Sequence, residues 1–154
     1  MQITGQELLP VPRERAWAAL NDVEMLKASI AGCESLTPLG GNEFEAQLGL
    51  SLGLIKVRFT GRLKLSDLRP PESYRLAFEG GGGAIGHGKG VAQVRLTLEN
   101  PEQTLLRYEV QLSLEGQVAQ MGGRWVEMGA RKIAADFFKS LNTRLAEIES
   151  NRDS

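Results

Sequence analysis

The chain is poor in the residues that most often build catalytic and metal sites. Its 154 residues include one cysteine, Cys33, and one histidine, His87. A single cysteine excludes an internal disulfide and favours a reducing compartment. A metal site needs several ligands, and no partner residues stand at ligand spacing from His87. We therefore expect no metal, no cofactor and no catalytic residue, with Cys33 as a small apolar side chain and His87 as an exposed one.

Long apolar runs and an excess of basic residues are also missing. No run approaches the ~20 apolar residues of a membrane span, and the N-terminus has no signal-peptide stretch. The 18 basic residues are balanced by 19 acidic ones, and no basic cluster is present. Nucleic-acid binding needs a positive footprint, so we expect none. Together these absences predict a cytoplasmic protein.

Alternation of apolar and polar residues dominates the middle of the chain. Five runs with a period of two lie between residues 43 and 115, for example residues 44–52 and 106–114. Such runs predict antiparallel strands that have one buried face and one wet face. Turn residues such as Gly53 separate the runs. Because no linker interrupts the pattern, we expect a single domain over residues 1–154.

The C-terminal part has the period of a helix instead. From about Val118 to Ile148, apolar residues recur every three or four positions along one stripe. Residues 2–9 have the pattern of a strand, and Pro12 and Asp22 mark the starts of two short helices. The sheet must bury its apolar face, and the long helix offers the only long apolar stripe. We therefore predict an α+β fold in which a curved antiparallel sheet wraps around the C-terminal helix.

A glycine-rich stretch over residues 80–90 resembles two phosphate-binding motifs. The pattern GxGxxG occurs at residues 81–86, and Lys89 stands where a phosphate-binding loop has its lysine. Both motifs require a helix directly after the loop, because the N-terminus of that helix holds the phosphate. Here the alternating residues 91–96 predict a strand. We therefore expect a bent strand connection, or a flap beside a cavity, and no nucleotide site.

Glycines inside the predicted C-terminal helix point to an incompletely filled core. Gly122, Gly123 and Gly129 each cost about 1 kcal/mol of helix stability relative to alanine. One reason for them is room for a bound molecule, since the methionine and aromatic side chains nearby adapt to irregular shapes. The alternative is an ordinary packed core. The predicted ligand-contacting residues are Leu50, Phe59, Phe78, Tyr108, Met121, Trp125 and Met128.

Several segments spread over residues 2–146 carry a family resemblance. They are Gly5, Pro10, residues 16–22, 32–36, 59–61 and 68–74, the glycine-rich stretch ending at Gly90, and residues 135–138. In these segments the chain resembles the carbon monoxide dehydrogenase CoxG family, within the START-like helix-grip (SRPBCC) superfamily of ligand-binding domains. The resemblance implies a helix-grip fold with two short helices after the first strand, and a hydrophobic cavity under the grip.

The resemblance also implies a function. It points to an accessory protein of a molybdenum-containing carbon monoxide dehydrogenase or related hydroxylase. Such a protein would bind a small apolar ligand, a quinone or a lipid, and link the enzyme to the membrane or the quinone pool. Two alternatives stay open: a recruitment or assembly factor that acts through its surface with no ligand, and a cyclase-like enzyme on the same fold.

An apolar hairpin tip at residues 52–55 bears on where the protein works. Apolar groups that cluster at an exposed turn are typical of contact sites. The tip is therefore a candidate for peripheral contact with the inner face of the membrane or with a partner. The alternative is that it packs against the helix or its neighbours.

Overall fold

The computed structural model of the protein describes residues 1–52, 55–82, 86–121 and 123–152, without the side chains of residues 50–52, 55–57, 118, 121 and 125. Most of the apolar tip at residues 52–55 therefore lies outside the described part. The elements, in chain order, are β1 (Gln2–Leu9), α1 (Arg13–Leu20), α2 (Val23–Ser29), β2 (Cys33–Gly40), β3 (Glu43–Leu52), β4 (Ile55–Arg69), β5 (Ser73–Gly81), β6 (His87–Asn100), β7 (Gln103–Glu115), η2 (Gln117–Met121) and α3 (Gly123–Arg152).

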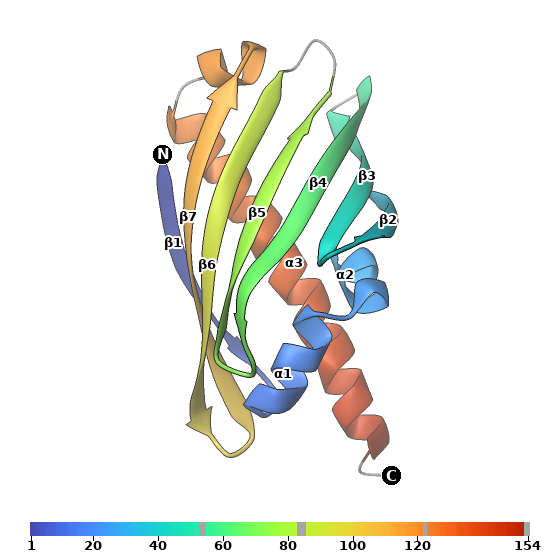
Figure 1. Ribbon diagram of the computed structural model, residues 1–154, viewed down its shortest axis with the longest axis vertical. Coiled ribbons are helices and arrows are strands. Elements are labelled where there is room, and N and C mark those ends of the chain that lie inside the picture. The colour runs from blue at the N-terminus through green and yellow to red at the C-terminus, as the bar shows by residue number, and fades with distance from the viewer. Residues whose placement is uncertain (53–54, 83–85, 122, 153–154) are drawn as a thin grey trace.

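The strands of the described residues form one curved antiparallel sheet of seven strands in the order β1-β7-β6-β5-β4-β3-β2. The five alternating runs are β3 to β7, which confirms the predicted meander. Helices α1 and α2 carry the chain from β1, at one edge, to β2 at the other edge (Figure 1). The Asp22 side chain caps α2, as predicted, by accepting hydrogen bonds from the backbone N–H groups of Glu24 and Met25 at 2.9 and 3.1 Å.

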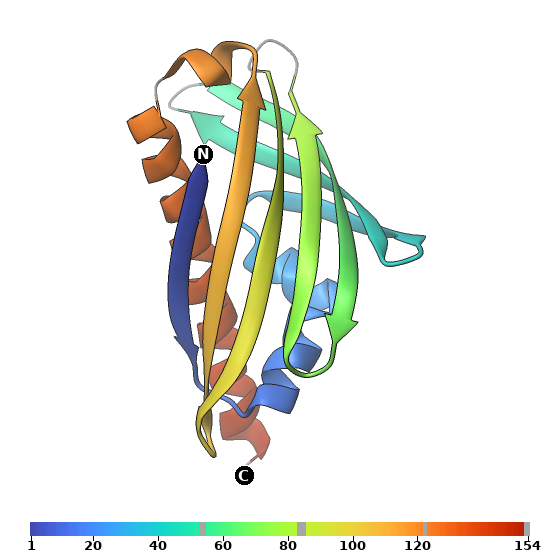
Figure 2. The ribbon, with the colours of Figure 1, turned by 60° about the vertical axis from the view of Figure 1, so that its left-hand side comes forward.

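Helix α3 runs along the concave side of the sheet, which is the predicted grip arrangement (Figures 1 and 2). Its buried stripe consists of Phe138, Leu141 and Leu145, which are 8%, 0% and 3% exposed. These residues recur every three or four positions, so they face the sheet together. Within the described residues, no helix has both the length and the apolar character that crossing a bilayer requires.

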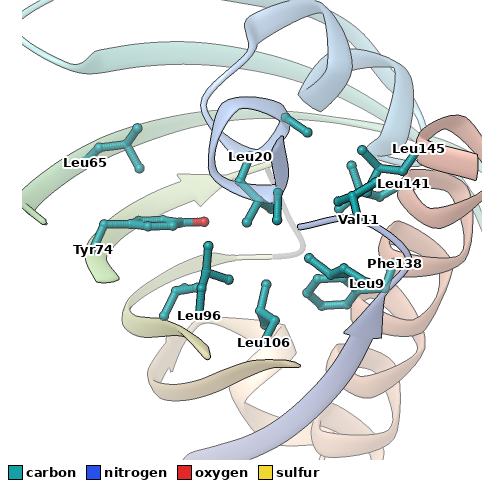
Figure 3. Packing of buried hydrophobic residues seen from close by; sticks show 13 residues of the cluster. Leu9, Val11, Leu20, Leu65, Tyr74, Leu96, Leu106, Phe138, Leu141 and Leu145 are labelled. Carbon is teal, nitrogen blue, oxygen red and sulfur yellow. The ribbon is translucent and has the colours of Figure 1, made fainter. Parts of the chain in front are cut away.

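The end of the grip nearest the C-terminus of α3 is solidly packed. Side chains from β1, α1, the sheet and α3 converge there (Figure 3); the fully buried ones include Leu9, Val11, Leu96, Leu106 and Leu141. The buried Thr104 hydroxyl donates a hydrogen bond to the Val11 carbonyl at 2.8 Å, so this polar group is paired within the core. Arg15 of α1 and Glu149 of α3 form an ion pair that joins the two helices.

Along one side, α3 is fastened to the edge strand β1. The Arg131 guanidinium donates to the Thr4 carbonyl at 3.1 Å. Further along the helix, the Asn142 amide donates to the Leu8 carbonyl at 3.2 Å. The two contacts are spaced along β1, so they hold α3 beside this edge strand of the sheet.

Candidate functional site

A cavity of about 450 Å³ lies between the concave face of the sheet and the first half of α3. Its size falls within the range of small-molecule sites. Strands β3 to β7 supply most of its wall, and α2 and α3 close it. The lining residues are Ile3, Leu20, Leu26, Ile30, Ala31, Leu36, Phe44, Leu63, Leu65, Tyr74, Leu76, Phe78, Ala92, Val94, Leu106, Tyr108, Val110, Leu112, Ala130, Ile133, Ala134, Phe137 and Phe138.

The cavity wall is almost entirely hydrocarbon. No charged side chain occurs among the described lining residues, and the polar side-chain groups there are the hydroxyls of Tyr74 and Tyr108. Transfer of an ion into such surroundings costs several kcal/mol or more, because nothing compensates the lost hydration. The arrangement therefore fits a neutral, largely apolar molecule.

Small residues on α3 leave the space that becomes the cavity. Ala130 and Ala134 point toward the sheet and line the cavity, whereas one turn later Phe138 fills the corresponding space and is buried. Residues four apart lie on the same face of a helix. The change from alanine to phenylalanine along that face therefore marks the boundary between the hollow and the solid part of the grip.

Glycines in the sheet let aromatic rings lie flat against it. A Cβ atom added to Gly90 of β6 would stand 2.5 Å from Cζ of Phe78, its cross-strand neighbour on β5. On β1, a Cβ atom at Gly5 would stand within 2.3 Å of Cζ of its neighbour Tyr108. The rings occupy the places where side chains of β6 and β1 would be. They therefore cover the sheet instead of projecting across the cavity.

We expect Gly90→Ala to destabilise the protein by about 1–3 kcal/mol, as overpacking of a filled site does. The added methyl group would meet Phe78 and would also stand 2.7 Å from the Gln111 carbonyl oxygen, which belongs to the sheet backbone. The ring can turn away, but the carbonyl cannot move without breaking the strand pairing. Urea unfolding monitored by circular dichroism measures the change.

The control for this prediction is the same substitution at Gly129 of α3. A Cβ atom added there meets nothing within 4 Å. Since alanine is the better helix former, Gly129→Ala should raise the free energy of unfolding by up to about 1 kcal/mol. Equal effects of the two substitutions would show that Phe78 does not lie over Gly90 in solution.

The structure brings together part of the predicted ligand-contacting set. Phe78 and Tyr108 both line the cavity. Phe59 lies against Gly82, directly after β5, and is not among the described lining residues, nor is Met128, whose side chain is 58% exposed. The side chains of Leu50, Met121 and Trp125 lie outside the described part of the structure.

Among the described residues of α3, those that line the cavity begin at Ala130, directly after the last of the three helix glycines. Gly129 is exposed to solvent, so its missing side chain adds no space between the helix and the sheet. Sequence reasoning also missed Tyr74, although it belongs to the same alternating run as Phe78 and therefore shares its face. It missed Leu26 of α2 and Ile30, which directly follows that helix, because nothing in their spacing places the short helix against the cavity.

The cavity opens beside the first half of α3, on the side away from β1. Ile133 lines the cavity and is nevertheless 61% exposed. Ala31, in the connection between α2 and β2, likewise lines the cavity and is exposed. These two residues form the rim of the opening. Arg131, which holds α3 to Thr4, lies about 200° around the helix from Ile133, so the fastened side and the open side are opposite.

The glycine-rich stretch has the strand geometry expected from its sequence. Strand β5 ends at Gly81, β6 begins at His87, and the two residues pair across the hairpin. Residues 83–85 lie outside the described part. Because a strand follows the loop, no helix N-terminus is available to hold a phosphate, and the expectation of a strand connection is confirmed. The His87 side chain is exposed, as predicted.

Cys33 is partly buried and not activated. Its Sγ atom lies 3.4 Å from the Ser35 carbonyl oxygen. Burial raises the pKa of the thiol and outweighs the opposing charge of Lys27 and the contact with Ser35. A nucleophilic cysteine needs the opposite shift, because the thiolate is the reactive form.

Comparison with known proteins places the chain in a family. The model of the carbon monoxide dehydrogenase CoxG family matches residues 5–146. No curated protein matches the chain significantly. A crystal structure of a conserved protein from Geobacillus kaustophilus is 29% identical, with a TM-score of 0.91 and 96% of each chain covered.

More distant solved structures share the fold alone. A START superfamily protein from Mycobacterium smegmatis is 10% identical, with a TM-score of 0.73 over 96% of this chain and 98% of its own. The Zhui aromatase/cyclase from Streptomyces sp. R1128 is 13% identical, with a TM-score of 0.68 over 95% and 93%. The fold is thus the START-like helix-grip fold, and the family match covers nearly the whole of it. The chain belongs to the carbon monoxide dehydrogenase CoxG family.

Proposed function

We propose that the protein is a non-enzymatic accessory protein that binds a small apolar molecule between the sheet and α3. The observation that carries this proposal is the cavity of about 450 Å³ with its hydrocarbon wall. Burial of apolar surface contributes about 25 cal/mol per Å², so an apolar guest is stabilised wherever it touches the wall. A well-packed core has no void of this size, and a void costs stability unless a ligand fills it.

The chemistry of the wall favours binding over catalysis. The described lining offers no carboxylate, imidazole or thiol to transfer a proton or attack a substrate. His87 is exposed on β6, outside that lining. The likeness to an aromatase/cyclase concerns the fold, and a fold by itself does not fix an activity.

The family membership supports a more specific role. We propose that the ligand is a quinone or a lipid, and that the protein links a molybdenum-containing hydroxylase to the membrane or the quinone pool. Ile133 is 61% exposed on the first half of α3 and forms the rim of the opening. An exposed apolar side chain at a cavity mouth favours transient contact with the inner membrane face, from which an apolar ligand is loaded.

Native mass spectrometry of gently purified protein, combined with thermal unfolding, tests the proposal. We expect a bound apolar molecule in one-to-one ratio, and a higher Tm when decyl-ubiquinone or monoolein is added to emptied protein. At a ligand concentration 100 times Kd, the stabilisation is about 2.7 kcal/mol. If neither compound is bound and no molecule co-purifies, while the protein still captures the hydroxylase, then it is a recruitment factor that acts through its surface.

A further inference from the structure

Tyr74 brings a buried polar group to the wall of the cavity. Its side chain comes from β5, lines the cavity and is only 6% exposed. The edge of the Trp17 ring packs on it, with the ring centroids 5.5 Å apart and the planes at 85°. Figure 3 shows the hydroxyl oxygen pointing away from β5 into the interior. The position of the hydroxyl is thus fixed by packing.

The Tyr74 hydroxyl has no hydrogen-bond partner in the part of the chain that the structure describes. Buried polar groups are normally paired, and an unpaired donor costs free energy because it has lost its hydration. Burial also raises the pKa of this hydroxyl, so at neutral pH it carries its proton. Tyr74 therefore gives the cavity a fixed donor that the described residues leave unused.

We propose that Tyr74 donates a hydrogen bond to a carbonyl-type oxygen of the ligand, so that the cavity selects neutral molecules with an acceptor and no donor at this position. This inference rests on the proposed function, because it names the chemical class of the same ligand. Tyr74 is in this sense a specificity-determining residue.

Counting donors and acceptors distinguishes a carbonyl from other polar groups. A ketone, ester or quinone oxygen accepts from Tyr74 and leaves no donor unpaired. An alcohol adds a donor of its own, so two donors share one new hydrogen bond and one of them stays unpaired. A carboxylate would place a charge in a lining that has no cationic side chain among its described residues. A carbonyl is therefore the best match.

Three naphthalenes of similar shape test the preference: 1-acetonaphthone carries a carbonyl, 1-(1-naphthyl)ethanol an alcohol, and 1-ethylnaphthalene no polar group. We expect the wild-type protein to bind the ketone about 5–10 times more tightly than the hydrocarbon, as measured by isothermal titration calorimetry, since one hydrogen bond has that net effect. The alcohol should bind less tightly than the ketone. Infrared spectra should show the carbonyl stretch of the bound ketone at lower frequency than in hydrocarbon solvent.

Tyr74→Phe removes only the hydroxyl and should abolish both the ketone preference and the infrared shift. Thr97→Val is the control, because it also removes a hydroxyl group, at an exposed position of β6 that is not among the described lining residues. It should retain the preference. Should the Phe variant fail to fold, the infrared shift in the wild-type protein alone decides whether a donor meets the carbonyl.

The outcomes separate this inference from the proposed function. Equal affinity for the three compounds, a preference for the alcohol, or a ketone preference that survives in Tyr74→Phe would overturn the role of Tyr74. Each of these results would leave the apolar cavity as a binding site. Failure of all three compounds to bind the wild-type protein would overturn both.

Discussion

We expect Ala134→Phe to abolish ligand binding while the protein stays folded. Ala134 lies on the cavity-facing side of α3, one turn before Phe138, and its methyl group is part of the cavity wall. A benzyl group added there occupies the space of the ligand. Binding of decyl-ubiquinone, or of 1-acetonaphthone, should weaken by at least about 100-fold, which corresponds to ~2.7 kcal/mol.

Stability should change little in this variant, because the new ring fills a void and gains contacts with the apolar wall. Overpacking of a closed core costs about 1–3 kcal/mol, but here the space exists beforehand. Thermal unfolding of the ligand-free proteins measures this, and calorimetry measures the affinity. A variant that still binds at wild-type affinity would show that the ligand lies outside the described cavity.

Ala135→Phe is the matched control. It makes the same chemical change at the next position of the same helix, and Ala135 is exposed and is not among the described lining residues. Both variants lose an alanine from the helix and gain one aromatic ring, so their effects on helix propensity cancel in the comparison. The affinity of Ala135→Phe should equal that of the wild type within experimental error.

The contrast between these two alanines shows why the cavity could not be placed from the sequence. The periods of two and of three to four positions predicted β3 to β7 and α3, because they follow from strand and helix geometry alone. Which helix residues face a hollow depends on how the helix is rotated over the sheet. Met128 was assigned to the cavity, yet it lies about 200° around the helix from Ala130, which lines it.

Strand β2 was not predicted, also for a physical reason. Its sequence contains Pro38 and shows no clear alternation, and most of its side chains are exposed. Such a sequence is tolerated because β2 is the edge strand, where one row of backbone groups needs no partner strand. The register with β3 shifts at Pro38. Pairing with β3, and not the local sequence pattern, therefore makes this segment a strand.

The Tyr74 hydroxyl also bears on which redox form of a quinone the proposed site would prefer. If the ligand is a quinone, its oxidised form presents acceptors only, whereas the reduced form brings hydroxyl donors. The donor of Tyr74 then favours the oxidised form. A carrier that binds the oxidised form more tightly delivers an electron acceptor to its enzyme and releases the reduced product, which is the order that an electron-transfer partner needs.

The largest loss of stability is expected from Phe138→Ala. Phe138 is 8% exposed and belongs both to the cavity wall and to the packed core. Its ring stacks on Tyr108 at a centroid distance of 5.9 Å and meets the edge of Phe137 at 5.1 Å. It is thus the partition between the hollow half and the solid half of the grip.

Removal of the Phe138 ring should cost about 3–5 kcal/mol, because a large apolar group is lost and the cavity extends into the core. The free energy of unfolding in urea measures the loss. Ile133→Ala is the control on the same helix: Ile133 also lines the cavity but is 61% exposed, so its truncation should cost less than about 1 kcal/mol. The enlarged cavity should also accept a larger guest, so 1-ethylnaphthalene should raise the Tm of Phe138→Ala more than that of the wild type. A loss below ~1 kcal/mol for Phe138→Ala would mean that the two halves of the grip are not separated by this ring.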